Sequence, residues 1–139
     1  MRPLIVMLLS ACTFLSGCGS GLRSLNPAPI VGPYEVEAVV DGNRIEYEIP
    51  DGSPEASAIQ RWLAAHRSGW SASIDTYAPG SLVIRSGNFN LMLNGETCIF
   101  TENRTFGGKQ LVKRLDAPSR EQLQAACRIP TASHDPPDH

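Results

Sequence analysis

The sequence has few of the features that mark an enzyme or a nucleic-acid-binding protein. It carries 12 Lys and Arg against 14 Asp and Glu, a net charge of −2, and so lacks the basic excess typical of nucleic-acid-binding domains. No GxSxG, HExxH, Walker-type or CxxC motif occurs, and the only histidines are His66, His134 and His139. These absences leave few candidates for a catalytic base or a metal ligand. We therefore expect no enzymatic activity, no cofactor, no metal and no nucleic-acid partner.

Long apolar runs are also scarce, and the one that exists lies at the N-terminus. Residues 4–15 are mostly apolar, which is too short for a membrane-spanning helix of about 20 residues but typical of a secretion signal. The run ends in Leu15-Ser16-Gly17-Cys18, which resembles the lipobox of bacterial lipoproteins at all four positions. The resemblance implies that residues 1–17 are removed as a signal peptide.

The lipoprotein resemblance also implies a modification and an address. In that family the cysteine, here Cys18, carries diacylglycerol, and its new amino terminus is usually acylated as well, with chains such as palmitate. Gly19 follows the cysteine where an Asp would favour the inner membrane. We therefore expect a protein lipid-anchored in the outer membrane and facing the periplasm.

Two cysteines remain in the part of the chain that we expect to fold. Cys98 and Cys127 form an even pair in an oxidising compartment, and a disulfide between them would stabilise the fold by roughly 3–4 kcal/mol. The alternatives are a metal pair or a nucleophilic thiol. No histidine of the expected domain lies near either cysteine in the sequence, so we predict the disulfide.

Composition divides the mature chain into three parts. Residues 18–33 are rich in Gly, Ser and Pro and are predicted to be a tether, residues 34–128 a single domain, and the Pro-rich residues 129–139 a flexible tail. Within the domain, alternating patterns and turn residues predict strands at 34–40, 44–49, 70–77, 81–85, 89–93, 96–101 and 110–115.

Two helices complete the pattern. Ser53-Pro54 is typical of a helix start, and Ile59, Trp62, Leu63 and His66 follow at the spacing of one buried stripe. His66 could be a catalytic base, but a half-buried or capping role is favoured. A shorter helix is predicted at 119–127. The order ββαβββββα predicts an α+β fold, an antiparallel β-sheet with two helices packed on it and one disulfide.

The first two strands carry an unusual row of acids. Asp41-Gly42-Asn43 predicts a hairpin, and alternation places four glutamates on one face of it: Glu35, Glu37, Glu46 and Glu48. Like charges opposite one another destabilise a sheet. The face is therefore either solvated, with the basic segment 104–128 packed alongside as compensation, or a surface that binds a basic partner. A loop around Arg104 and Phe106 is a second candidate contact site.

These features together suggest a non-enzymatic binding protein. Size, lipid anchor, predicted disulfide and acidic face resemble the small periplasmic lipoproteins that serve as immunity proteins or inhibitors. The resemblance implies a protein partner, a secreted toxin or cell-wall hydrolase, with Glu35, Glu37, Glu46 and Glu48 as the expected contacts. The alternative is a structural or assembly lipoprotein of an envelope machine, in which the acidic face is only solvated.

Overall fold

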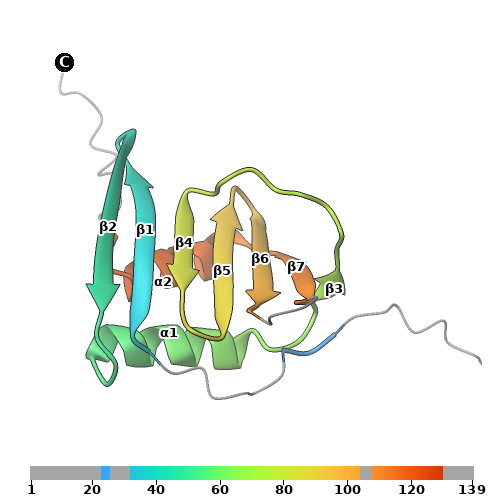
Figure 1. The fold of residues 1–139 in the computed structure, drawn as a ribbon, viewed down its shortest axis with the longest axis horizontal. Coiled ribbons are helices and arrows are strands. Elements are labelled where there is room, and N and C mark those ends of the chain that lie inside the picture. The colour runs from blue at the N-terminus through green and yellow to red at the C-terminus, as the bar shows by residue number, and fades with distance from the viewer. Residues whose placement is uncertain (1–22, 26–31, 104–107, 130–139) are drawn as a thin grey trace, which may run out of the picture.

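Seven strands form one antiparallel sheet in the computed structural model, which describes residues 23–25, 32–103 and 108–129. The strands are β1 (Tyr34–Val40), β2 (Asn43–Ile49), β3 (Ser71–Ala72), β4 (Leu82–Arg85), β5 (Phe89–Asn94), β6 (Thr97–Glu102) and β7 (Gln110–Arg114). Their spatial order is β2-β1-β4-β5-β6-β7-β3 (Figure 1). The helices are α1 (Pro54–Ala65) and α2 (Ala117–Ala126). The predicted element order and the α+β class are confirmed.

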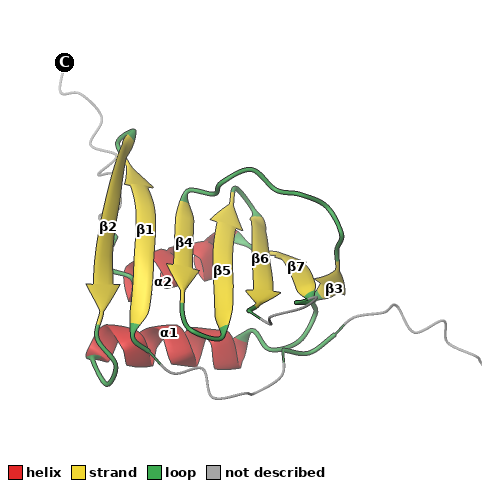
Figure 2. Ribbon diagram, in the orientation of Figure 1, coloured by secondary structure: helices red, strands yellow, loops and turns green. Residues whose placement is uncertain are grey.

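Both helices lie on the same face of the sheet (Figure 2). The apolar side chains of the strands alternate toward them, because successive residues of a strand point to opposite faces. The core contains Trp62 and Leu63 of α1, Leu123 of α2 and the inward side chains of six strands, Tyr34, Val36, Ile84, Leu91 and Phe100 among them. Since the helices cover one face, the other face is left to the polar positions of the strands.

The hairpin of β1 and β2 forms as its sequence predicts. Asp41 and Gly42, the two residues between the strands, both have positive φ, of 50° and 78°, as a type I′ turn requires. The register pairs Tyr34 with Ile49 at one end and Val40 with Asn43 at the other. β2 is the edge strand of the sheet, so one side of its backbone faces no other described strand.

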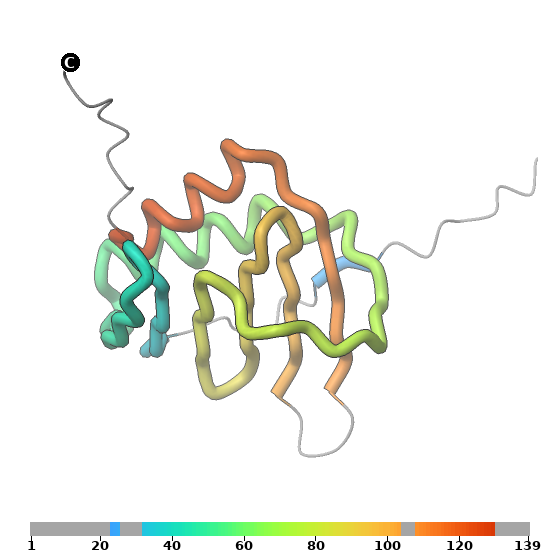
Figure 3. The backbone as a smooth tube through the Cα atoms, turned by 90° about the horizontal axis from the view of Figure 1, so that it is seen from above, coloured from blue at the N-terminus to red at the C-terminus, as the bar shows by residue number. Residues whose placement is uncertain are grey.

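The predicted strand at 70–77 is much shorter in the structure. Only Ser71 and Ala72 pair with β7, because the chain must then cross from β3, at one edge, to β4 in the middle of the sheet. The connecting residues 73–81 run over the face opposite the helices (Figure 3). The loop meets the sheet at Gly80, where a Cβ atom would collide with the Leu93 carbonyl of β5. A glycine is therefore needed at this position.

Part of the segment predicted as a tether is packed on the domain. Arg23 and Trp70 exchange two backbone hydrogen bonds of 2.6 and 3.2 Å, and the Leu25 N–H donates to the Arg67 carbonyl at 2.7 Å. The Leu25 side chain belongs to the core and is only 2% exposed. The chain is thus bound to the end of the sheet that carries β3, well before the first strand begins.

The predicted disulfide between Cys98 and Cys127 is wrong, because both residues are buried free thiols. Cys98 lies on β6, whereas α2 carries Cys127 across the sheet to β2, where the Cys127 carbonyl accepts a hydrogen bond from the Tyr47 hydroxyl. β6 and β2 are four strand positions apart, which is about 19 Å at the usual strand spacing. A disulfide needs Cα atoms within about 7 Å.

No helix in the described ranges is long and apolar enough to cross a membrane. The candidate signal peptide, with Cys18, lies outside the described residues, as do Arg104, Phe106, His134 and His139.

Candidate functional site

The four glutamates predicted to share a face do share one. Glu35 lies directly opposite Glu48, and Glu37 lies opposite Glu46, in the register of β1 and β2. All four point away from the helices, on the same face as the loop 73–81. The hairpin turn and the two-residue period of the strands were sufficient to predict this arrangement.

The four carboxylates do not have the same environment. Glu37 is only 9% exposed and is held between two arginines, with 2.9 Å to Arg44 Nη1 and 2.9 Å to Arg85 Nη2. Both arginines are diagonal neighbours of Glu37, which lies on β1. Arg44 on β2 pairs with Val39, and Arg85 on β4 pairs with Glu35. Glu37 is therefore the centre of an ion-pair cluster and not a free contact residue.

Glu35, Glu46 and Glu48 are exposed and form no ion pair with any residue in the described part of the chain. We call these three residues the acidic strip. They lie on the two strands at one edge of the sheet. Because Glu35 and Glu48 face each other directly, the folded protein keeps two like charges close together at an exposed site.

The expected compensation by the basic segment 104–128 is not found. The described bases of that segment lie on and beside β7 and along α2, and β7 is five strand positions from β2. The charge that balances Glu37 comes instead from Arg85 on β4. Sequence reasoning missed Arg85, because β2, α1, β3 and the loop 73–81 separate β4 from β1 along the chain.

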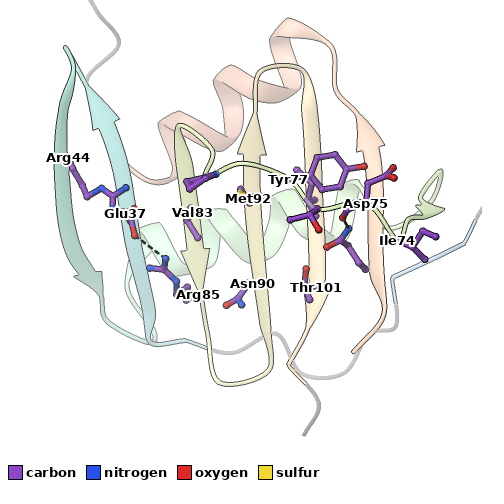
Figure 4. A pocket seen from close by; sticks show the side chains of 14 residues that line it. Glu37, Arg44, Ile74, Asp75, Tyr77, Val83, Arg85, Asn90, Met92 and Thr101 are labelled. Atoms are coloured by element: carbon purple, nitrogen blue, oxygen red, sulfur yellow. Dashed lines mark hydrogen bonds and ion pairs between the residues drawn. The ribbon is translucent and has the colours of Figure 1, made fainter. Parts of the chain in front are cut away.

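A groove of about 580 Å³ lies beside the ion-pair cluster, on the same face of the sheet. Its floor includes Val83, Met92 and Ile99, and the cluster of Glu37, Arg44 and Arg85 closes one end (Figure 4). The loop residues Ile74, Asp75, Thr76, Tyr77 and Pro79 form the other side. The open face is therefore charged toward β2 and partly apolar under the loop.

Hydrogen bonds hold the loop in place over the sheet. The Gln110 side-chain amide donates to the Asp75 carbonyl at 2.7 Å, and the Ser73 and Tyr77 hydroxyls are 3.0 Å apart. Asn94 donates to the Ala78 carbonyl at 3.4 Å. These contacts could not be predicted from the sequence, because Ala78-Pro79-Gly80 indicates only that a strand ends there.

His66 has the capping role that was favoured over a catalytic one. It is the C-cap residue of α1 and stacks on the Trp62 ring at 4.1 Å between centroids. Its Nδ1 lies 2.8 Å from the Trp62 carbonyl, and its Nε2 lies 3.1 Å from the Ser119 hydroxyl of α2. Both ring nitrogens are therefore engaged, Nδ1 within α1 and Nε2 in the contact between the two helices.

Neither thiol of the folded domain is activated for chemistry. Burial raises the pKa of Cys98 to about 12 and the pKa of Cys127 to about 12, so that both are protonated at neutral pH, and a nucleophilic cysteine needs the thiolate. In the described ranges no three His, Cys, Asp or Glu side chains are grouped as metal ligands would be.

Comparison with models of protein families, with curated proteins and with solved structures finds no match for this chain.

Proposed function

We propose that this chain is a lipid-anchored periplasmic lipoprotein that acts, without catalysis, as an immunity-type inhibitor of a secreted toxin or cell-wall hydrolase. Its acidic strip would bind a basic surface beside the active site of that partner. The observation that carries the proposal is the set of three exposed glutamates, Glu35, Glu46 and Glu48, which share one face of the hairpin and form no ion pair with a described residue, although Arg85 lies opposite Glu35 in the register of β1 and β4. The anchor would be Cys18, on the strength of the lipobox.

Electrostatics favours this use of the strip. Opposed carboxylates weaken the hairpin that carries them, and only Glu37 has its charge balanced by arginines. A basic partner would remove the repulsion between Glu35 and Glu48. Complementary charges also raise the rate of association and exclude wrong partners, which suits an inhibitor that must bind a toxin before it acts.

Rigidity supports the proposal as well. Seven residue pairs join β1 to β2, and four join β1 to β4. The ion pairs of Glu37 with Arg44 and Arg85 then connect the side chains of all three strands. A surface that is already ordered loses less conformational entropy on binding, so that a strip of three charges could contribute to a tight complex.

The test is capture followed by an assay of inhibition. The purified lipoprotein is used as bait for secreted proteins, beside a variant with Glu46→Gln and Glu48→Gln. A matched control carries Glu96→Gln and Glu121→Gln, two exposed glutamates elsewhere on the domain. We expect one hydrolase to bind with one-to-one stoichiometry and to lose its activity, with the intact bait and with the control but not with the strip variant.

Two results would contradict the proposal. If the strip variant inhibits the captured hydrolase as well as the intact chain does, the acidic strip is not the contact surface. If all three baits recover the same components of an envelope machine and no hydrolase, the chain is a structural or assembly lipoprotein with a solvated acidic strip.

A further inference from the structure

The edge of the sheet opposite the acidic strip carries the opposite charge. Five cations lie on and around β3 and β7. Arg114 forms an ion pair with Glu96, and the other four form no ion pair with a residue in the part of the chain that the structure describes. We call this surface the basic edge, and it comprises Arg23, Arg67, Lys109 and Lys113. Two acids lie at the same edge, the exposed Asp75 and the partly buried Glu102, whose backbone N–H donates to the Lys109 carbonyl. The edge therefore has a formal net positive charge of about two.

Three of the four cations gather around Trp70. Arg23 pairs with Trp70 through the backbone, and the Arg67 carbonyl accepts from the Leu25 N–H at 2.7 Å. The Lys113 ammonium donates to the Ser68 carbonyl at 2.7 Å and lies 6.0 Å from the centroid of the Trp70 ring. The first described residues of the chain are thus built into this basic edge (Figure 1).

The other end of the basic edge presents an apolar side chain. Ile74 follows β3 and is fully exposed, the most exposed large apolar residue of the described chain. Lys109 is close to it, because the Ser73 N–H donates to the carbonyl of Gln110, the residue after Lys109. Figure 4 shows Ile74 at the outer side of the sheet, at the end of the groove opposite the ion-pair cluster. An exposed isoleucine beside cations has the chemistry of a contact with a lipid interface.

The length of the chain before Arg23 limits where this edge can be. Four residues separate Cys18 from Arg23, and five extended peptide units span at most about 18 Å. A diacylglycerol on Cys18 would therefore keep the basic edge close to the bilayer. The acidic strip, six strand positions from β3, would lie about 29 Å farther along the sheet.

We propose that the basic edge of Arg23, Arg67, Lys109 and Lys113 binds anionic lipid headgroups, with Ile74 in the interface, and thereby turns the acidic strip away from the membrane. This inference rests on the lipid anchor of the proposed function. The attraction follows from charge, since basic residues close to an anionic surface each add about fivefold to its binding. The protein would thus meet its partner with the strip already directed into the periplasm.

The experiment attaches the mature chain, starting at Cys18, to vesicles through a maleimide lipid. Cys98 and Cys127 are buried and do not compete for the reagent. Depth is reported by a new tryptophan, either Ile74→Trp at the basic edge or the matched Val39→Trp on β1, a second exposed large apolar residue. Quenching by brominated lipid is measured after subtraction of the signal of the parent chain, whose Trp62 and Trp70 are buried.

In vesicles of phosphatidylethanolamine and phosphatidylglycerol we expect strong quenching of Ile74→Trp and little quenching of Val39→Trp. Replacing phosphatidylglycerol by phosphatidylcholine, or adding Arg67→Gln and Lys109→Gln, should lower the preference for the bound orientation on the order of tenfold. The equally charged control with Arg61→Gln and Arg128→Gln should keep it.

Equal quenching at the two positions, or equal effects of the two double variants, would overturn the inference. Because the lipid is attached chemically, this result does not depend on modification in the cell. Mass spectrometry of Cys18 from cells tests the anchor, and the assay of inhibition tests the proposed function, so each can fail separately.

Discussion

The two ends of the sheet differ in charge, in packing and in the way they are held. At the β2 end an edge strand carries exposed glutamates, and its inward residues Ile45 and Tyr47 are only partly buried. At the β3 end Trp70 is completely buried, and its backbone exchanges two hydrogen bonds with Arg23. One small sheet thus combines a well-packed end with a less buried, acidic end.

The largest effect on stability is expected from Trp70→Ala. This change removes the ring that packs edge-on against Phe100 and the hydrogen bond of 2.6 Å from the indole N–H to the His66 carbonyl. We expect the free energy of unfolding to fall by about 3–5 kcal/mol. Ile45→Ala at the other end should lower it by only about 1–2 kcal/mol, because Ile45 is partly exposed. Urea denaturation measures both, and equal losses would contradict the difference in packing.

A smaller effect is expected from Glu37→Gln within the charged end. The change leaves Arg44 and Arg85 without their shared carboxylate, but both arginines are about half exposed and remain hydrated. We therefore expect a loss of about 1–2 kcal/mol in the free energy of unfolding. Glu35→Gln is the matched control, since Glu35 faces Glu48 on one side and Arg85 on the other, so that lost repulsion and lost attraction nearly cancel, with a change within about 0.5 kcal/mol. A larger loss for Glu35→Gln would show that the strip is a structural element.

The smallest effect at neutral pH concerns the two thiols, one toward each end of the sheet. Iodoacetamide at pH 8 should leave Cys98 and Cys127 unmodified in the folded protein and should modify both in denaturant without a reductant. A disulfide would block the second reaction. Mass spectrometry counts the added groups. If both cysteines stay unmodified in denaturant, they form a disulfide, which would contradict the free thiols of the structure.

The same thiols give the fold a limit at high pH. Burial raises the pKa of Cys98 and of Cys127 to about 12 from an ordinary value of 9.0, and burial, followed by the charge of Cys127, raises the pKa of Tyr47 to about 12 from 10.0. Above about pH 9 the unfolded chain therefore releases protons that the folded chain keeps, so the free energy of unfolding should fall between pH 9 and pH 12. Urea denaturation at several pH values checks this sign.

Local patterns of the sequence were enough to predict much of the molecule. The turn at Asp41 and the alternation around it gave both strands and the shared face of the glutamates. The cap at Ser53 and the stripe ending at His66 gave α1 and its contact with α2. Each of these features depends on residues only a few positions apart.

Features that depend on the order of strands in space could not be predicted in this way. Cys98 and Cys127 are about 30 residues apart in sequence. Cys98 lies on β6, however, and Cys127 contacts β2, which is four strand positions away. Arg85 reaches Glu37 only because β4 inserts beside β1. The loop 73–81 and its groove exist because β3 pairs with the far edge of the sheet. None of these three features can be predicted from distances along the chain alone.

The central claim is that the acidic strip is the part of the molecule that recognises a partner. The most direct measurement is a calorimetric titration of the captured hydrolase with the intact chain, the variant with Glu46→Gln and Glu48→Gln, and the control with Glu96→Gln and Glu121→Gln. We expect the strip variant to bind the hydrolase at least about tenfold more weakly, with a dissociation constant that depends less on salt. The control should bind as the intact chain does. Equal dissociation constants for the strip variant and the intact chain would contradict the central claim.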